Sequence, residues 1–277
     1  MKVILAKHAG FCMGVRRAVE TTLKLVETRQ APISTFGPLI HNPQVLDMLA
    51  EKGVHVLEEV PADTRGTVVI RAHGVPPARK KHLEASGAVV EDATCPRVVK
   101  VQAIIDKYRR QGYTTVIVGD RDHAEVEGLM GHAGRAGLVV SRMSDLDGLE
   151  LSPPYIVVSQ TTQDEEMFQA ITAAILERYP GGKVFNTICD STHKRQDEVR
   201  EMCHQVDALV VVGGRNSANT KRLAEIADGL NCPVFLVETE SELDPEKLRA
   251  YQLVGVTAGA STPAWIIREV VETLESI

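Results

Sequence analysis

Three stretches of the chain share one form, in which a cysteine precedes a helical pattern: HAGFCMGVRRAVE (8–20), EDATCPRVVKVQA (91–103) and FNTICDSTHKRQDEV (185–199). Their cysteines are Cys12, Cys95 and Cys189. Each stretch follows a strand-like or polar segment and opens an amphipathic helix. Because one local arrangement recurs three times, it indicates an internal repeat.

Polar landmarks beyond each cysteine support the repeat. A glycine follows an apolar run 25, 24 and 24 residues after the respective cysteine: Gly37, Gly119 and Gly213. Four residues beyond each glycine stands a polar side chain: His41, His123 and Ser217. A third landmark ends a later apolar strand, 32 to 44 residues further on: His73, Thr161 and Ser261. This shared order predicts three divergent copies of one α/β unit.

Short apolar, β-branched runs alternate with helical patterns along the chain. The expected strands are 3–5, 68–70, 89–90, 115–118, 156–158, 208–212, 234–237 and 253–256. One expected helix follows Cys12 directly. The others cover residues 98–108, 167–178, 196–206 and 220–230. Alternation of this kind is typical of parallel sheets covered by helices. We therefore expect an α/β fold of three pseudo-symmetric lobes with mostly parallel sheets: 13–94, 95–188 and 189–277. The N-terminal strand, in residues 1–12, is expected near the central site and is not assigned to a lobe.

Composition narrows the class of protein. The 277 residues are 44% apolar and 25% charged, which is typical of globular proteins, and the net charge is −6. An acidic chain is not expected to bind nucleic acid or anionic membranes through its overall field. No apolar run approaches the roughly 18 residues of a membrane span. The apolar stretch near the N-terminus is too short for a secretory signal, so the expected location is the cytoplasm. Five sparse cysteines in a reducing compartment are not expected to form a disulfide scaffold.

The repeat predicts where the chemistry lies. Equivalent residues of three copies meet near a pseudo-threefold axis, and parallel sheets carry ligands at the carboxyl ends of their strands. A cysteine at a helix start favours the thiolate, the form that binds metal. Three thiolates suit zinc with one open position, or three irons of a four-iron cluster. Cys203 and Cys232 fall outside the repeat, and we expect them to pack in the core.

A set of histidines and neutral donors accompanies the cysteines, and its chemistry suits phosphate oxygens: His41, His73, His123, Ser217, Asn219 and Ser261. Glu125 follows His123 by two residues and is a proton donor if a dry site raises its pKa. On spacing alone, an exposed loop carboxylate is the simpler interpretation of Glu125, and strand-end capping that of Thr161.

These motifs resemble one known family. The segments GFCMGVRRA, IHNPQV, AHGV, DATCPRV, GDRDHAEVEG, SQTT, TICDSTHKRQ, VVGGRNSANTKRLAE and GVTAGASTP run in family order from residue 9 to residue 263. They are similar to the LytB or IspH family of 4-hydroxy-3-methylbut-2-enyl diphosphate reductases. The resemblance implies an iron–sulfur enzyme of the non-mevalonate isoprenoid pathway. Its substrate is a small diphosphate, and its electron donor is a ferredoxin or a flavodoxin.

The resemblance also implies roles for residues of this chain. Cys12, Cys95 and Cys189 would hold a central 4Fe–4S cluster with one open iron. Glu125, Thr161 and His123 would form the catalytic set, with Glu125 as the proton-relay acid. The implied substrate contacts are His41, His73, His123, Thr161, Thr192, Ser217, Ala218, Asn219 and Ser261. Ala218 stands where many relatives have serine, so one hydroxyl donor is missing and its backbone amide remains.

Two other functions are compatible with the same cysteines. One is a non-catalytic iron–sulfur or zinc sensor that binds a phosphorylated metabolite, and the other is a zinc hydrolase. The absence of a fourth cysteine in the repeat pattern and the carboxylate of Glu125 favour the enzyme that the family resemblance implies.

Overall fold

The computed structural model describes residues 1–29, 32–60 and 64–277. These residues form three four-stranded sheets, called A, B and C, in which all paired strands run parallel. The chain divides into two compact units. Unit 1 consists of residues 1–16, 40–47 and 190–277, and unit 2 of residues 17–39 and 48–189. Sheet A belongs to unit 1, and sheets B and C belong to unit 2.

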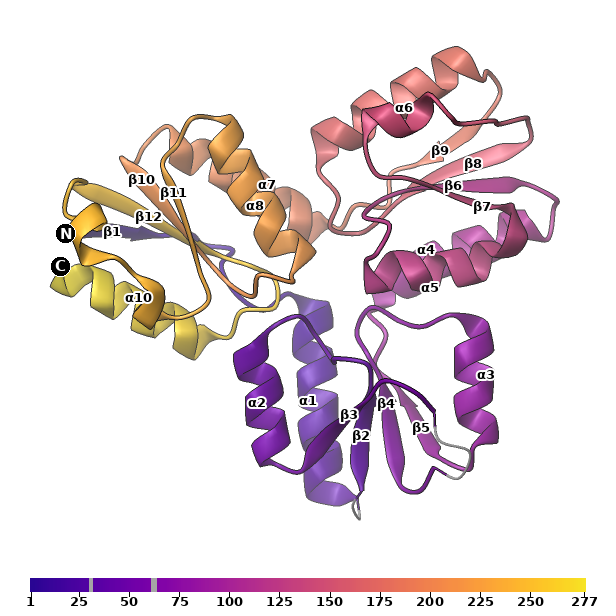
Figure 1. Cartoon of the computed structure of the whole chain (residues 1–277), viewed down its shortest axis with the longest axis horizontal. Helices are drawn as coiled ribbons and strands as arrows, with labels where there is room; N and C mark the ends of the chain where they lie inside the picture. Colours follow the sequence, from indigo (N-terminus) through magenta and orange to yellow (C-terminus); the bar gives the residue numbers. More distant parts are fainter. Residues whose placement is uncertain (30–31, 61–63) are drawn as a thin grey trace. The chain divides into compact units, whose positions relative to one another are not determined.

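Sheet A is built from both ends of the chain. Its strands, in spatial order, are β1 (Lys2–Leu5), β12 (Leu253–Ala258), β10 (Ala208–Val212) and β11 (Val234–Val237). One face is covered by α7 (Asp190–Cys203) and α8 (Ala218–Gly229), and the other by α10 (Ala264–Ser276) (Figure 1). Between β11 and β12 lie η3 (Glu240–Glu242) and α9 (Pro245–Leu248). The N-terminal strand is therefore an edge strand of the sheet formed by the C-terminal part of the chain.

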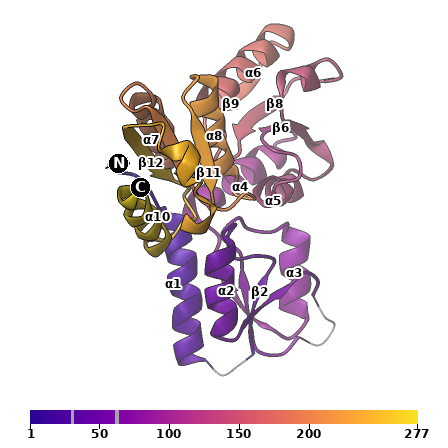
Figure 2. The same cartoon turned by 60° about the vertical axis from the view of Figure 1, so that its left-hand side comes forward.

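Sheet B has the strand order β3 (Val54–Leu57), β2 (Ile33–Phe36), β4 (Thr67–Ile70) and β5 (Val89–Asp92). On one face Leu83 of α3 (Pro77–Ala85) packs against Val68 and Ile70. Two further helices are α1 (Met13–Thr28) and α2 (Pro43–Glu51). Figure 2 shows α2 and α3 on opposite sides of β2.

Sheet C repeats this arrangement with the order β7 (Gly137–Val140), β6 (Thr114–Val118), β8 (Tyr155–Ser159) and β9 (Lys183–Phe185). Apolar side chains of α4 (Pro96–Arg109) and α5 (Ala124–Ala133) pack on one face, and those of α6 (Glu165–Arg178) pack on the other (Figure 1). Two short 3₁₀ turns, η1 (Gly134–Ala136) and η2 (Met143–Leu146), flank β7.

Corresponding strands occupy the same positions in the three sheets, which confirms the predicted α/β fold with three parallel-sheet lobes. The glycine landmarks directly follow the first central strands: β2, β6 and β10. The third landmarks follow the second central strands: β4, β8 and β12. The cysteines follow the edge strands β1, β5 and β9. β1 thus takes in sheet A the place that β5 and β9 take in sheets B and C.

Four strands were not predicted from the sequence, namely one buried central strand and three edge strands. Central strands such as β6, β8 and β10 are almost wholly buried, because helices cover both faces of a parallel sheet. They therefore read as continuous apolar runs. The missed strands are β2, which contains Ser and Thr, and the short or half-exposed edge strands β3, β7 and β9. Among the described residues, none of the helices has the length and apolar character that crossing a membrane requires.

Candidate functional site

The backbone amide of each predicted ligand cysteine is bound to the loop after the neighbouring central strand. The hydrogen bonds run from Cys12 to the carbonyl of Ala260 (3.0 Å), from Cys95 to that of Ala72 (2.9 Å) and from Cys189 to that of Thr161 (2.9 Å). Ala260 and Ala72 each precede a third landmark, and Thr161 is one. Each cysteine is therefore fixed beside the third landmark of its own sheet, at the carboxyl ends of the strands.

The same cysteines stand at helix N-termini. Cys95 is the N-cap of α4, while Cys12 and Cys189 directly precede α1 and α7. The amide of Val15, in the first turn of α1, points at the Cys12 sulfur at 3.5 Å. All three cysteines are half-buried. Half-buried thiols beside helix amides are suited to bind metal as thiolates, so this donor set fits an iron–sulfur cluster.

Cys203 and Cys232 differ from the repeat cysteines. Both pack into the apolar cluster between sheet A and the helices α7 and α8, which confirms the prediction of core packing. Burial raises the pKa of the Cys203 thiol to about 12, and the neighbouring Cys232 acts in the same direction. A thiol in this environment stays protonated and is a poor metal ligand.

Unit 2 contains a buried acid that is linked to Cys189, one of the predicted ligand cysteines. Glu125 lies in the first turn of α5 and is only 2% exposed. Its Oε1 accepts a hydrogen bond from the amide of Thr161 and its Oε2 accepts one from Thr161 Oγ1, each at 2.7 Å. Because the Thr161 carbonyl accepts from the Cys189 amide, a single threonine joins the acid to the cysteine.

The environment of Glu125 keeps this carboxyl partly protonated near neutral pH, because it raises the pKa. Burial raises the pKa of this carboxyl from its ordinary value of 4.5 to about 7. The hydrogen bonds from Thr161 oppose the shift because they favour the carboxylate, and the charge of Asp120 adds to it. The exposed-loop interpretation of Glu125 is therefore wrong: residues Ala124–Ala133 form a helix that buries Glu125 in its first turn.

Two histidines of unit 2 lie edge to face. His123 is the N-cap of α5, and its Nδ1 accepts a hydrogen bond from the Glu125 amide at 3.1 Å. A ring that accepts at Nδ1 carries its proton on Nε2, where it can be donated to an anion. The rings of His73 and His123 are 5.2 Å apart at an interplanar angle of 88°. The loop after β4 thus meets the start of α5.

Close packing on α5 sets the position of the His73 loop. A Cβ added at Gly131 would lie 2.5 Å from Pro76 Cβ, which is too short for any contact between carbon atoms. A Cβ added at Gly128 would meet the His73 carbonyl oxygen at an ordinary 3.7 Å. The loop is also held by Arg71, which donates to the Gly74 carbonyl (3.2 Å).

We expect Gly131→Ala to push this loop off α5, because the added methyl overlaps Pro76. Overpacking of this kind lowers the free energy of unfolding by about 1–3 kcal/mol. Gly128→Ala is the matched control: it adds the same methyl one turn earlier without a clash, and its higher helix propensity adds up to about 1 kcal/mol of stability. Urea denaturation of both variants checks the difference, and equal stabilities would contradict it.

Unit 1 carries donors at the start of α8. Ser217 is the N-cap, and its Oγ accepts a hydrogen bond from the Thr220 amide at 3.3 Å. Ala218 and Asn219 follow in the first turn. Asn219 is 2% exposed, and among the described residues no acceptor meets its Nδ2. A buried amide donor left over at a helix N-terminus is suited to bind an anion.

His41 and Ser261 are brought together in unit 1. Ser261 Oγ donates to the His41 carbonyl at 3.1 Å. The segment also approaches the loop before α8, where a Cβ on Gly214 would lie 2.6 Å from the His41 carbonyl oxygen. Only glycine allows this approach, which places His41 near the donors of α8. Thr192 is buried in the first turn of α7.

Asn42 is a polar side chain that the sequence analysis missed. Its Oδ1 caps α2 by accepting from the Val45 amide at 3.0 Å. Asn42 is fully buried, and within the described part of the chain its Nδ2 meets no acceptor. Asn followed by Pro is a helix-start signal that could have revealed it. In the other two copies the landmark residue itself, His123 or Ser217, is the N-cap.

The predicted residues divide between the units. Unit 1 carries Cys12, His41, Thr192, Ser217, Ala218, Asn219 and Ser261, and unit 2 carries His73, Cys95, His123, Glu125, Thr161 and Cys189. In both units they gather on loops and helix starts at the carboxyl ends of the strands. Their assembly into one site stays a prediction.

The fold and these side chains define an α/β protein of three similar lobes, with half-buried thiols, polar side chains at helix starts and a buried acid at the carboxyl ends of its strands. The family model described as LytB protein matches residues 3–275. The chain therefore belongs to the LytB family, and the resemblance found in the sequence is confirmed.

Curated relatives and solved structures agree with this assignment. The chain is 44% identical to a 4-hydroxy-3-methylbut-2-enyl diphosphate reductase of Solidesulfovibrio magneticus, with 100% of both chains covered. It is 39% identical to the enzyme of that name from Aquifex aeolicus, covering 99% of this chain and 96% of the relative. A reductase structure from Plasmodium falciparum matches with a TM-score of 0.93 at 27% identity, over 98% of this chain and 87% of the other. A second structure, whose protein is described as the terminal enzyme of the non-mevalonate pathway, matches with a TM-score of 0.72 at 39% identity over the whole of both chains.

Proposed function

We propose that this protein reduces 4-hydroxy-3-methylbut-2-enyl diphosphate to isopentenyl diphosphate and dimethylallyl diphosphate, the last step of the non-mevalonate pathway. The reaction consumes two electrons and two protons, breaks the allylic C–O bond and releases water. The proposal rests on the hydrogen bonds that connect Cys189 to Thr161 and Thr161 to Glu125. They put a group that can donate a proton close to a predicted cluster ligand.

Cys12, Cys95 and Cys189 would hold a 4Fe–4S cluster. Three half-buried thiols at helix N-termini fit this group, and the repeat supplies no fourth. When bound, such a cluster supplies electrons and leaves one iron without a protein ligand, as a Lewis acid for the substrate hydroxyl. The backbone amides of the three cysteines donate hydrogen bonds that would keep the ligand set in place.

Glu125 would supply the protons. With a pKa of about 7, a large fraction of this carboxyl is protonated at neutral pH. The carboxylate that remains after proton transfer is also stable enough to form at this pH. Thr161 Oγ1, 2.7 Å from Glu125 Oε2, would pass the proton on to the departing hydroxyl group. His123, whose Nδ1 accepts from the Glu125 amide, would present its Nε2 proton to the diphosphate.

Donors of both units would bind the diphosphate. Ser217 and the buried amide of Asn219 lie at the N-terminus of α8, where unpaired backbone amides add to them. The Ala218 amide belongs to this group, so the missing serine hydroxyl costs one donor. His41, His73 and Ser261 would complete the set, and Thr192 would contact the bound substrate. A local set of neutral donors and histidines would let an acidic protein bind an anion.

A ferredoxin or a flavodoxin would donate the electrons one at a time, as the family resemblance implies. The same proposal places the enzyme in the cytoplasm, where a reducing environment keeps the three thiols available to iron.

The test is an anaerobic assay of the protein reconstituted with iron and sulfide. We expect a brown protein that, with reduced methyl viologen, converts the substrate to the two five-carbon diphosphates. An iron-loaded protein that leaves the substrate unchanged contradicts the proposal. A colourless protein that is purified anaerobically with zinc would instead support the zinc hydrolase, and ligand binding without turnover would support the sensor.

A further inference from the structure

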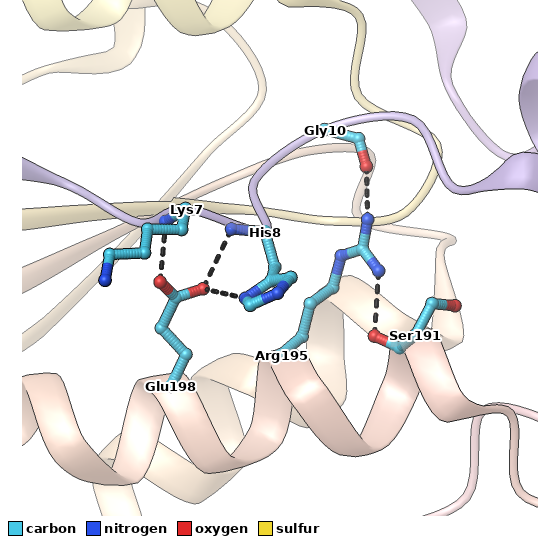
Figure 3. Close-up of polar contacts among 6 residues, drawn as sticks. All are labelled: Lys7, His8, Gly10, Ser191, Arg195 and Glu198. Atoms are coloured by element: carbon cyan, nitrogen blue, oxygen red, sulfur yellow. Dashed lines mark hydrogen bonds and ion pairs between the residues drawn. The ribbon is translucent and has the colours of Figure 1, made fainter.

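Two side chains of α7 hold the loop that carries Cys12. We call residues 6–12, which connect β1 to α1, the Cys12 loop. Figure 3 shows Arg195 and Glu198 of α7 beneath this loop, each directed at backbone groups of it. The two residues are three apart and therefore lie on one face of the helix. All these residues belong to unit 1.

Arg195 makes the inner contact. It is 4% exposed and spans from its own helix to the loop: one terminal nitrogen donates to the Ser191 carbonyl (2.8 Å) and the other to the Gly10 carbonyl (2.6 Å). A buried guanidinium has a high desolvation cost unless its donors are satisfied. The Gly10 carbonyl, two residues before Cys12, therefore has a partner that is costly to lose.

Glu198 makes the outer contact, on the part of the loop next to β1. Its Oε1 accepts from the Lys7 amide at 2.6 Å and its Oε2 from the His8 amide at 2.9 Å. The His8 ring adds a contact from Nδ1 to Oε2 at 3.1 Å. One carboxylate thus binds two successive amides, an arrangement that fixes the direction of the backbone as well as its position.

The length of the connection explains why Cys12 needs these contacts. Cys95 follows the end of β5 by three residues and Cys189 follows the end of β9 by four, whereas Cys12 follows the end of β1 by seven. A longer irregular segment has more backbone freedom to lose when its last residue is held in place. Arg195 and Glu198 bind the loop at Lys7, His8 and Gly10. These contacts leave only short segments of the loop backbone unrestrained.

We propose that Arg195 and Glu198 are positioning residues that hold Cys12 ready to bind the cluster. Neither would touch the substrate or the iron; each would act through the backbone of the Cys12 loop. The role in cluster binding rests on the proposed function, but the order of the loop is a property of the protein without a cluster. It can therefore be measured separately.

The test compares thiol reactivity in the anaerobic, cluster-free protein. N-ethylmaleimide labelling followed by peptide mass spectrometry measures the rates at Cys12, Cys95 and Cys189 separately. We expect Arg195→Met to speed labelling of Cys12 roughly tenfold, because hydrogen bonds to a charged group no longer oppose local opening of the loop. The rates at the other two cysteines should stay unchanged. Arg200→Met, on the same helix, is the matched control.

A second pair of variants covers the case in which Arg195→Met does not fold. Glu198→Ala removes the more exposed contact, and Glu201→Ala, exposed on the same helix, is its control. Glu198→Ala should also speed labelling of Cys12 alone. If Cys12 labels at the wild-type rate in every folded variant, or if all three cysteines accelerate equally, the proposal is overturned.

The reconstituted protein gives an independent measurement. With a ferrous chelator, absorbance of the cluster should decay several-fold faster in the Arg195 and Glu198 variants than in their controls, because a ligand that opens more often exposes iron more often. If the wild type takes up no cluster, the proposed function fails, while the labelling experiment still tests the positioning of Cys12.

Discussion

Replacing Glu125 by Gln is expected to lower turnover by about 10²–10⁴-fold, the range for losing a general acid. The amide has the size of the carboxyl and keeps a hydrogen bond with Thr161, but it carries no transferable proton. The affinity for substrate should change little, because Glu125 is not among the predicted diphosphate donors. Steady-state turnover with reduced methyl viologen and equilibrium binding of the substrate measure the two effects.

Glu166→Gln is the matched control, since Glu166 is an exposed first-turn glutamate of α6. It should retain wild-type turnover. Equal losses of turnover and binding in Glu125→Gln would argue against a proton role and for a structural one. The cluster spectrum of the variant should be that of the wild type, which separates loss of protons from loss of iron.

The raised pKa of Glu125 also makes stability depend on pH. Between pH 4.5 and about 7 the unfolded chain loses the proton that the folded protein keeps, so the free energy of unfolding falls as the pH rises. The shift corresponds to about 3 kcal/mol. Glu125→Gln lacks this dependence, so its stability relative to wild type should increase over the same interval. Denaturation of both proteins at pH 5 and pH 8 measures it.

Replacing Cys95 by Ala is expected to abolish iron–sulfur binding and turnover together. Even second-layer changes at metal sites cost roughly 10–100-fold in affinity or activity, and loss of one of three ligands should exceed that. The substitution removes the sulfur but leaves the hydrogen bond from the backbone amide of residue 95 to the Ala72 carbonyl, so the variant should still fold. Iron content and the visible spectrum after anaerobic reconstitution are the measurements.

Cys203→Ala provides the contrast, because Cys203 packs in the core beside Cys232. It should bind iron as the wild type does and lose only some stability from a smaller side chain. If Cys203→Ala lost the cluster while Cys95→Ala kept it, the assignment of ligands from the repeat would be wrong.

The repeat could be recognised in the sequence because its landmarks are local. A glycine after a buried strand and a polar residue at a helix start depend on nearby neighbours, so their spacing survives in three divergent copies. Continuous apolar runs likewise revealed β6, β8 and β10, which are covered on both faces. The lobe boundaries at 13–94, 95–188 and 189–277 stay a prediction.

The sequence by itself thus determined the fold class, the three candidate ligand cysteines and the family. Only the tertiary structure decided that β1 completes sheet A beside β12, that Glu125 is buried against Thr161, and that Arg195 reaches Gly10. Strand pairing, desolvation and a buried hydrogen bond each depend on groups far away in the sequence, 185 residues in the case of Arg195 and Gly10. A local pattern carries no record of such neighbours, so spacing alone made Glu125 look like an exposed loop residue, and the burial that raises its pKa became visible only in the folded chain.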